Sequence, residues 1–157
     1  MFVVLFLIFA WFNILIMVTL PRKLPMVVNF LLFMVIEVVL TNKLTIIGFN
    51  YELFEINTSI PHFLSLILHN DFTITFVLLT FANVFLTARR AWIRWGISLY
   101  TFSMQLFLGL ELRWNEVLFN REWNTFMESV MIVVILAYTL FWGYVFQKMA
   151  AKEGWVR

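Results

Sequence analysis

The sequence contains no cysteine and little charge, and each absence excludes a class of function. Without cysteine the chain has no disulfide, no iron–sulfur cluster, no cysteine-based zinc site and no thiolate nucleophile. Charged residues make up only 13% of the chain, and the formal net charge is +2. This weak positive balance, without a cluster of lysine and arginine among stacking aromatic residues, argues against binding to nucleic acid.

Catalytic and cofactor-binding motifs are also missing. The sequence has no Gly-x-Ser-x-Gly elbow, no glycine-rich phosphate loop and no His-Glu-x-x-His pair. With only five glycines and three prolines, it has neither a flexible linker nor a low-complexity tract. We therefore expect one domain over residues 1–157 that is not an enzyme and holds no cofactor or metal ion.

Apolar residues, in contrast, make up 63% of the chain and give it a mean hydropathy of +0.93. These values lie far outside those of soluble domains and indicate an all-α bundle in the cell membrane. A helix needs about 20 apolar residues to cross the hydrocarbon core. We predict five transmembrane spans at about residues 2–20, 26–47, 72–88, 91–110 and 127–147.

The apolar run over residues 61–88 is longer than one bilayer crossing requires. The polar tripeptide His69-Asn70-Asp71 interrupts this run, and Asn and Asp are good helix caps. We therefore predict a short interfacial helix over residues 61–68 and a span that begins at Phe72, with a single tilted helix as the alternative. The amphipathic connection over residues 111–124 is predicted to lie flat on the same outer surface.

Charged and aromatic residues mark the two predicted membrane surfaces. Lysine and arginine collect in cytoplasmic connections, and eight of the eleven lie in the first connection, the third connection and the tail: Arg22, Lys23, Arg89, Arg90, Arg94, Lys148, Lys152 and Arg157. The other three, Lys43, Arg113 and Arg121, lie among most of the carboxylates. This pattern predicts an N-terminus outside and a cytoplasmic C-terminus. Five tryptophans are predicted to anchor the interfaces: Trp92, Trp95, Trp114, Trp123 and Trp155.

Polar side chains within the predicted spans indicate which helix faces meet, because helices in lipid associate through small and hydrogen-bonding residues. Four spans have such a stripe. The residues are Asn29, Glu37 and Thr41; Thr80, Asn83 and Thr87; Ser98, Thr101, Gln105 and Gly109; and Glu128, Thr139, Gly143 and Gln147. The first span has little besides Asn13, so we expect it at the edge of the bundle, against lipid or a partner protein.

Glu37 lies about halfway along the second span, where an ionised carboxylate is costly unless it is hydrated or paired. It is the main candidate for an intramembrane polar site, together with Asn29, Asn83, Gln105 and Thr139. One interpretation is a proton or cation site. The other is a neutral carboxyl group that is hydrogen-bonded across the bundle, and the sequence leaves both open.

A second candidate site groups His69, Asp71 and Glu128 at the outer surface. His62 shares a helical face with His69 but stands two turns away, at roughly 10 Å. Metal ligation needs three or four converging groups. We therefore expect polar residues at the membrane surface here rather than a metal site, with Asp71 as a helix cap.

Four stretches of the chain carry a resemblance to a known family: Pro21-Arg22-Lys23-Leu24-Pro25, Asp71-Phe72-Thr73-Ile74, the basic connection near Arg89, and the region from Trp114 to Tyr138 with Trp123 and Glu128. In these stretches the chain resembles a family of small, uncharacterised five-helix membrane proteins of spore-forming bacilli and clostridia. His69-Asn70 departs from the more apolar lead-in of that family. The resemblance implies membrane residence and a role in the spore or cell envelope, and it assigns no reaction or ligand.

Two function classes compete. We favour a non-enzymatic membrane subunit that packs against itself as a homo-oligomer, or against a larger membrane protein, in contact with membrane lipid. The small size, the missing motifs and the apolar first span motivate this prediction. The alternative is a proton- or ion-conducting protein that uses Glu37 and the polar stripes of spans two to five. A lipid-modifying enzyme with an acidic outer site is the third hypothesis.

Overall fold

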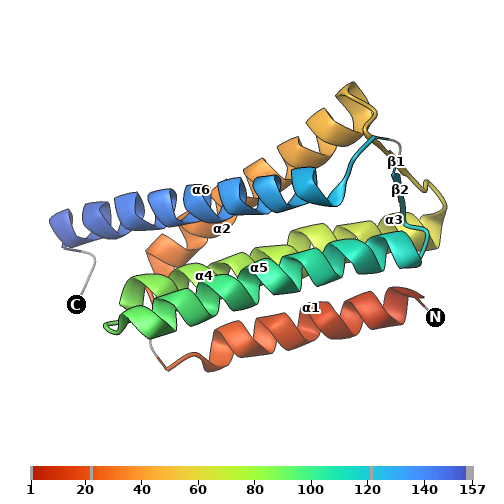
Figure 1. The fold of residues 1–157 in the computed structure, drawn as a ribbon. Helices are drawn as coiled ribbons and strands as arrows, with labels where there is room; N and C mark the ends of the chain where they lie inside the picture. The colour runs from red at the N-terminus through yellow and green to blue at the C-terminus, as the bar shows by residue number, and fades with distance from the viewer. Residues whose placement is uncertain (1, 22, 121, 155–157) are drawn as a thin grey trace.

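The chain is mostly helical in the computed structural model, which describes residues 2–21, 23–120 and 122–154 (Figure 1). In chain order the elements are α1 (Phe2–Thr19), α2 (Met26–Lys43), the π-helix η1 (Leu44–Asn50), β1 (Phe54–Ile56), α3 (Ile60–Ile67), the π-helix η2 (Leu68–Ile74), α4 (Thr75–Thr87), α5 (Ala91–Trp114), β2 (Leu118–Asn120) and α6 (Thr125–Lys152). The predicted all-α class is confirmed. Four residues that are predicted to lie at membrane surfaces fall outside the described residues: Arg22, Arg121, Trp155 and Arg157.

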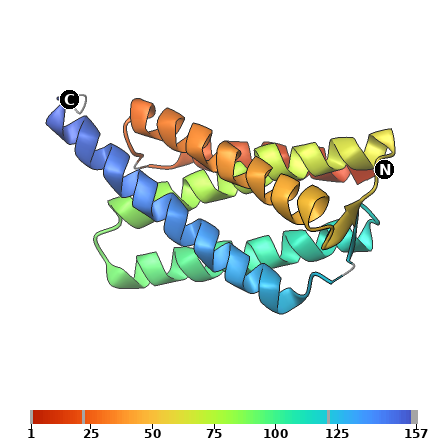
Figure 2. The ribbon, with the colours of Figure 1, turned by 90° about the horizontal axis from the view of Figure 1, so that it is seen from above.

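Within the described ranges these elements form five helical rods, because η1 continues α2 and because α3, η2 and α4 follow one another without a break. Figure 1 shows that the chain reverses direction from each rod to the next. As a result α1 begins at one end of the bundle and α6 finishes at the other. Seen from above, α6 runs obliquely across the bundle (Figure 2). It packs against α2, α4 and α5.

Three of the rods are long and apolar enough to cross a membrane: Met26–Gly48, Ile60–Thr87 and Thr125–Lys152. This finding is compatible with a membrane protein. The apolar part of α1, Val3–Thr19, is shorter. The 24 residues of α5 are long enough but more polar. Length and composition therefore single out three of the five predicted spans.

The rod over Ile60–Thr87 contradicts the prediction of a separate interfacial helix at residues 61–68. No helix end separates these residues from α4. The backbone instead widens into η2 at His69-Asn70-Asp71, and hydroxyl groups bond to the carbonyls of the wide turns. Thr73 Oγ1 donates to Leu68 O at 3.2 Å, and Thr75 Oγ1 donates to Asn70 O at 3.2 Å. Asp71 therefore caps no helix end, and the alternative of a single long helix fits.

The connection after α5 is a second correction, because it forms no amphipathic helix lying flat. In the structure α5 continues to Trp114, and β2 then pairs antiparallel with β1, with Glu55 opposite Phe119. Val117 and Trp123 are buried against residues from other elements. Val117 and Trp123 thus pack into the protein, whereas Trp114 and Phe119 remain exposed.

Charge separates along the bundle. Lys23 lies between α1 and α2, Arg89 and Arg90 lie between α4 and α5, and Lys148 and Lys152 lie in the last turns of α6. Figure 1 shows these three segments at the same end of the bundle. Most of the described carboxylates lie at the opposite end, close to β1 and β2: Glu52, Glu55, Asp71, Glu111, Glu116, Glu122 and Glu128.

The inward faces agree with the polar stripes in three rods and agree in part in the fourth. Thr80, Asn83, Thr101, Gln105, Glu128, Thr139 and Gly143 are buried. For α2 the prediction holds only in part. Asn29 and Glu37 are half-buried and hydrogen-bond to Asn83 and Thr75, whereas Thr41 is exposed and the fully buried residues of α2 are Val28, Leu32, Ile36 and Leu40. At Gly143 a Cβ atom would lie 2.8 Å from Leu86 Cδ1 of α4 and 3.7 Å from Leu32 Cδ2 of α2. Gly143 therefore permits the close approach of α6 to α4, and Leu32 of α2 lies at ordinary van der Waals distance from the same position.

Candidate functional site

Asn29 and Asn83 form a polar link at the basic end of the bundle. Asn83, on α4, is 0% exposed. Its Nδ2 donates to Asn29 Oδ1 at 2.7 Å, and its Oδ1 accepts from the backbone N–H of Leu24 at 2.7 Å. Asn29 Nδ2 donates to Leu24 O at 2.9 Å. Because these bonds satisfy the backbone of the segment between α1 and α2, the pair fixes where α2 begins relative to α4.

Glu37 forms a separate link nearer the middle of the bundle. It is half-buried on α2, and its Oε1 accepts a hydrogen bond of 2.6 Å from Thr75 Oγ1 at the start of α4. Asn29 lies eight residues away on the same helix, or about 12 Å along its axis. Glu37 therefore connects α2 to α4 through a threonine that our sequence-based site did not include.

Gln105 and Thr139 occupy two further positions in the interior. Gln105, on α5, is 5% exposed, and its Nε2 has no hydrogen-bond partner. Thr139, on α6, is 1% exposed, and its Oγ1 is likewise without a partner. The five residues of the predicted intramembrane site thus divide into the Asn29–Asn83 pair, the Glu37–Thr75 link and these two separate side chains.

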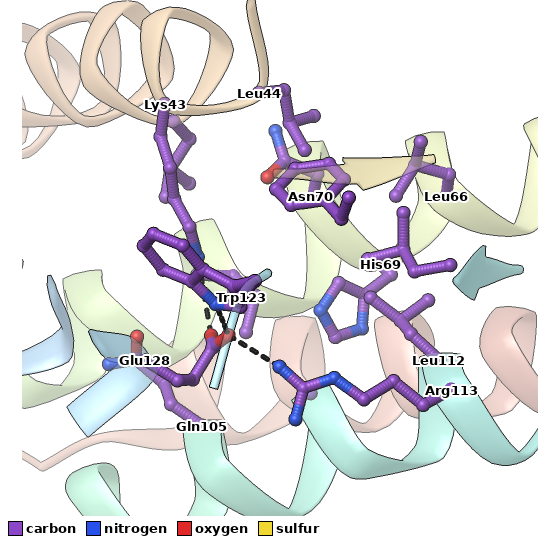
Figure 3. A pocket seen from close by; sticks show the side chains of 15 residues that line it. Lys43, Leu44, Leu66, His69, Asn70, Gln105, Leu112, Arg113, Trp123 and Glu128 are labelled. Carbon is purple, nitrogen blue, oxygen red and sulfur yellow. Dashed lines mark hydrogen bonds and ion pairs between the residues drawn. The ribbon is translucent and has the colours of Figure 1, made fainter. Parts of the chain in front are cut away.

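The densest polar constellation is at the acidic end, where Glu128 lies in the first turn of α6 (Figure 3). Its Oε2 accepts from Trp123 Nε1 at 2.6 Å and from Arg113 Nη2 at 2.9 Å. Lys43 Nζ, at the end of α2, lies 3.5 Å from Glu128 Oε1. We call Glu128, Arg113, Lys43 and Trp123 the carboxylate cluster. It joins α2, α5, α6 and the segment after β2 in one place.

Local structure explains why these four side chains converge. The β1–β2 pairing returns the chain after α5 toward η1, and Trp123 packs edge-on against Phe54 with ring centroids 6.5 Å apart. The adjacent Asn124 caps α6 by accepting from the N–H of Met127 at 2.9 Å. The first turn of α6, which carries Glu128, is thus held where α5 approaches, and a Cβ atom at Gly109 would lie 3.5 Å from Glu128 Oε1.

A cavity adjoins the carboxylate cluster. Its volume, measured as the space open to the centres of water molecules, is about 40 Å³. The lining side chains include Lys43 from α2, His69 and Asn70 from η2, Gln105 and Arg113 from α5, and Glu128 from α6. Figure 3 shows His69 and Arg113 on one side of this space and Glu128 with Trp123 on the other.

The predicted outer-face site is only partly assembled. His69 and Glu128 line the same cavity, and the His69 ring is 6% exposed with its Nδ1 unpartnered. Asp71 lines a different hollow, beside Thr41 and Thr45, and accepts from Asn70 Nδ2 at 2.9 Å. His69 and Asp71 are two residues apart, which places them on different sides of the helix.

Arg113, Lys43 and Trp123 are the members of the site that sequence reasoning missed. Lys43 and Arg113 stood out only as the cations on the acidic side of the predicted topology. Trp123 was assigned to a membrane interface, but it is 8% exposed and donates to Glu128. The signal present in the sequence was the charge of Lys43 and Arg113, which is opposite to that of most ionisable residues on the acidic side.

Metal binding finds no support in the geometry of the described chain. Among residues 2–21, 23–120 and 122–154, no three His, Cys, Asp or Glu side chains come close enough to hold a metal ion. His62, at the acidic end, lies with its Nδ1 2.6 Å from Ser59 Oγ.

Comparisons with family models, with curated proteins and with solved structures give no match for this chain.

Proposed function

We propose that this protein is a non-enzymatic subunit of the cell membrane that assembles with a second copy of itself or with a larger membrane protein. All five rods are proposed to span the membrane, with the N-terminus outside and the C-terminus in the cytoplasm. The gathering of Lys23, Arg89, Arg90, Lys148 and Lys152 at one end supports this orientation, because basic residues are retained on the cytoplasmic side.

The two rods that fall short by length or composition are compatible with this topology. The 18 residues of α1 extend about 27 Å, close to the roughly 30 Å of a hydrocarbon core. The polar Thr101 and Gln105 of α5 are buried, whereas its exposed large residues include Leu99 and Phe107. The surface that α5 offers to lipid is therefore largely apolar.

The exposed face of α1 is the observation that carries the assembly proposal. One face of α1, with Phe6, Ala10, Asn13 and Met17, is buried against α3, η2 and α4. The other face is exposed and broad. It includes one stripe at alternating intervals of four and three residues, Val4, Ile8, Trp11, Leu15 and Val18, with Leu5, Leu7 and Phe12 beside it. This 3.5-residue period is the one with which a helix packs along a second helix.

Trp11 strengthens this argument because of its depth. It lies at the midpoint of α1 and is 64% exposed. Tryptophan is enriched at the membrane surface, where its indole N–H meets polar groups. An outward indole halfway across the bilayer lacks such groups in lipid, whereas a helix packed on this face supplies both ring contacts and a hydrogen-bond acceptor.

The resemblance described in the sequence analysis is the ground for proposing that the protein acts in a spore or cell-envelope process.

Single-cysteine cross-linking tests this assembly, since the chain has no cysteine of its own. If α1 packs against α1 of a second copy, Ile8→Cys is expected to form disulfide-linked dimers in oxidised native membranes. The contact between the two helices would bring the equivalent positions within disulfide reach. Leu99→Cys is the matched control, at an exposed leucine of α5. With a larger partner, Ile8→Cys stays monomeric and Trp11→Ala reduces the co-purified protein several-fold. Equal cross-linking at both positions, or no effect in either assay, would contradict the proposal.

Proton conduction is the second candidate function, and Glu37 is the residue that motivates it. Its carboxyl group is hydrogen-bonded to Thr75. This link, the Asn29–Asn83 pair and the carboxylate cluster lie at separate depths along the bundle. We therefore expect liposomes that contain wild type or Glu37→Gln to show the same negligible proton flux. A strong flux that the substitution abolishes would favour a conductor over a purely structural subunit.

A further inference from the structure

The cavity beside the carboxylate cluster contains more positive than negative charge. Lys43 and Arg113 both contact Glu128, and their side chains are only 21% and 16% exposed. One carboxylate cannot neutralise two cations, so one positive charge remains at the wall of the cavity. Among the other carboxylates near this end, Glu52, Glu55, Glu116 and Glu122 are exposed, so solvent screens them. Asp71 and the buried Glu111 do not line the cavity.

Two polar side chains in the wall lack partners. Gln105 Nε2 and His69 Nδ1 are buried and make no hydrogen bond, although both residues line the cavity and are 5% and 6% exposed. A buried donor that makes no hydrogen bond is unfavourable, because it has lost its bonds to water without replacement. The amide nitrogen of Gln105 is a donor only, and His69 Nδ1 donates in one of the two neutral tautomers. The wall therefore offers hydrogen-bond donors beside an uncompensated positive charge.

The geometry points to a binding site for one small monovalent anion in this cavity, of the size of chloride or formate. The anion would neutralise the excess charge of Lys43 and Arg113 and accept from Gln105 Nε2. A water molecule needs roughly 10 to 15 Å³ of such space, so about 40 Å³ admits a chloride or formate ion but not a sugar acid such as gluconate. This site does not depend on the proposed assembly, and either proposal stands if the other fails.

Thermal unfolding of the detergent-purified full chain tests the anion site. We expect sodium chloride and sodium formate to raise the unfolding midpoint of wild type above its value in sodium gluconate at equal ionic strength. The shift should be about 8 °C at an anion concentration roughly one hundred times Kd. Equal midpoints in all three salts would mean that the cavity holds water only, which would overturn the proposal.

Variants separate the site from a general salt effect. Gln105→Met removes the donor without touching the ion pairs, so it should remain folded and lose most of the chloride-induced shift. Gln147→Met makes the same change on α6 outside the cavity lining and should retain the full shift. Radiolabelled chloride should bind wild type at one ion per chain in equilibrium dialysis and be displaced by formate. Absence of bound chloride, or an unchanged shift in Gln105→Met, would refute the site.

Discussion

Replacing Glu128 with glutamine is expected to lower the free energy of unfolding by about 3 kcal/mol. The change removes the one carboxylate that faces Lys43, Arg113 and Trp123, and it leaves two cations in a largely buried site. Removing one partner of a buried ion pair costs 3 to 5 kcal/mol as a rule, and we take about the lower end because Lys43 and Arg113 keep some contact with solvent. Denaturant unfolding of the purified protein in mixed micelles measures the change.

Two further variants show whether the loss comes from the buried cations. Glu122→Gln removes an exposed carboxylate close by in sequence and should change stability by less than about 0.5 kcal/mol. Combining Glu128→Gln with Arg113→Gln should cost less than the sum of the two single changes, since the second substitution removes a stranded charge. Strict additivity, or equal losses at Glu122 and Glu128, would show that the carboxylate cluster does not stabilise the fold.

Asn83→Leu is expected to destabilise the basic end of the bundle by about 2 kcal/mol. Leucine has similar bulk, but it leaves the N–H of Leu24 and the Oδ1 of Asn29 without their partner, at roughly 1 kcal/mol each. The readout is twofold: unfolding of the whole protein, and hydrogen exchange at the Leu24 amide, which should accelerate well beyond the global change in stability.

Asn42→Leu provides the matched control for Asn83. Asn42 is exposed on α2, and its side chain bonds only to Val38 O in its own helix, at 2.7 Å. Its replacement should change stability by no more than about 0.5 kcal/mol and leave the Leu24 amide protected. If the Asn83 and Asn42 variants were equally stable, the Asn29–Asn83 link would not anchor the α1–α2 connection.

Part of the candidate site was predictable from local pattern. The periodicity of Thr101 and Gln105 in α5, and of Glu128 and Thr139 in α6, correctly placed these residues on inward faces. Their spacing fixes a shared face because an α-helix turns 100° per residue. The same reasoning was only partly right for α2, where Asn29 and Glu37 bond to α4 but Thr41 is exposed, because α2 also buries an apolar face and packs against α6.

The sequence alone determined the helical class, the positions of the apolar runs, the separation of basic from acidic ends and the inward faces of α4, α5 and α6. Each of these depends on composition or periodicity within one segment. Only the tertiary structure decided that the helix continues through His69-Asn70-Asp71, that the segment after α5 pairs with β1, and that Lys43, Arg113 and Trp123 meet at Glu128. These features join groups on different elements. Their energies depend on contacts and burial that arise when the helices pack, which no single stretch of the chain contains.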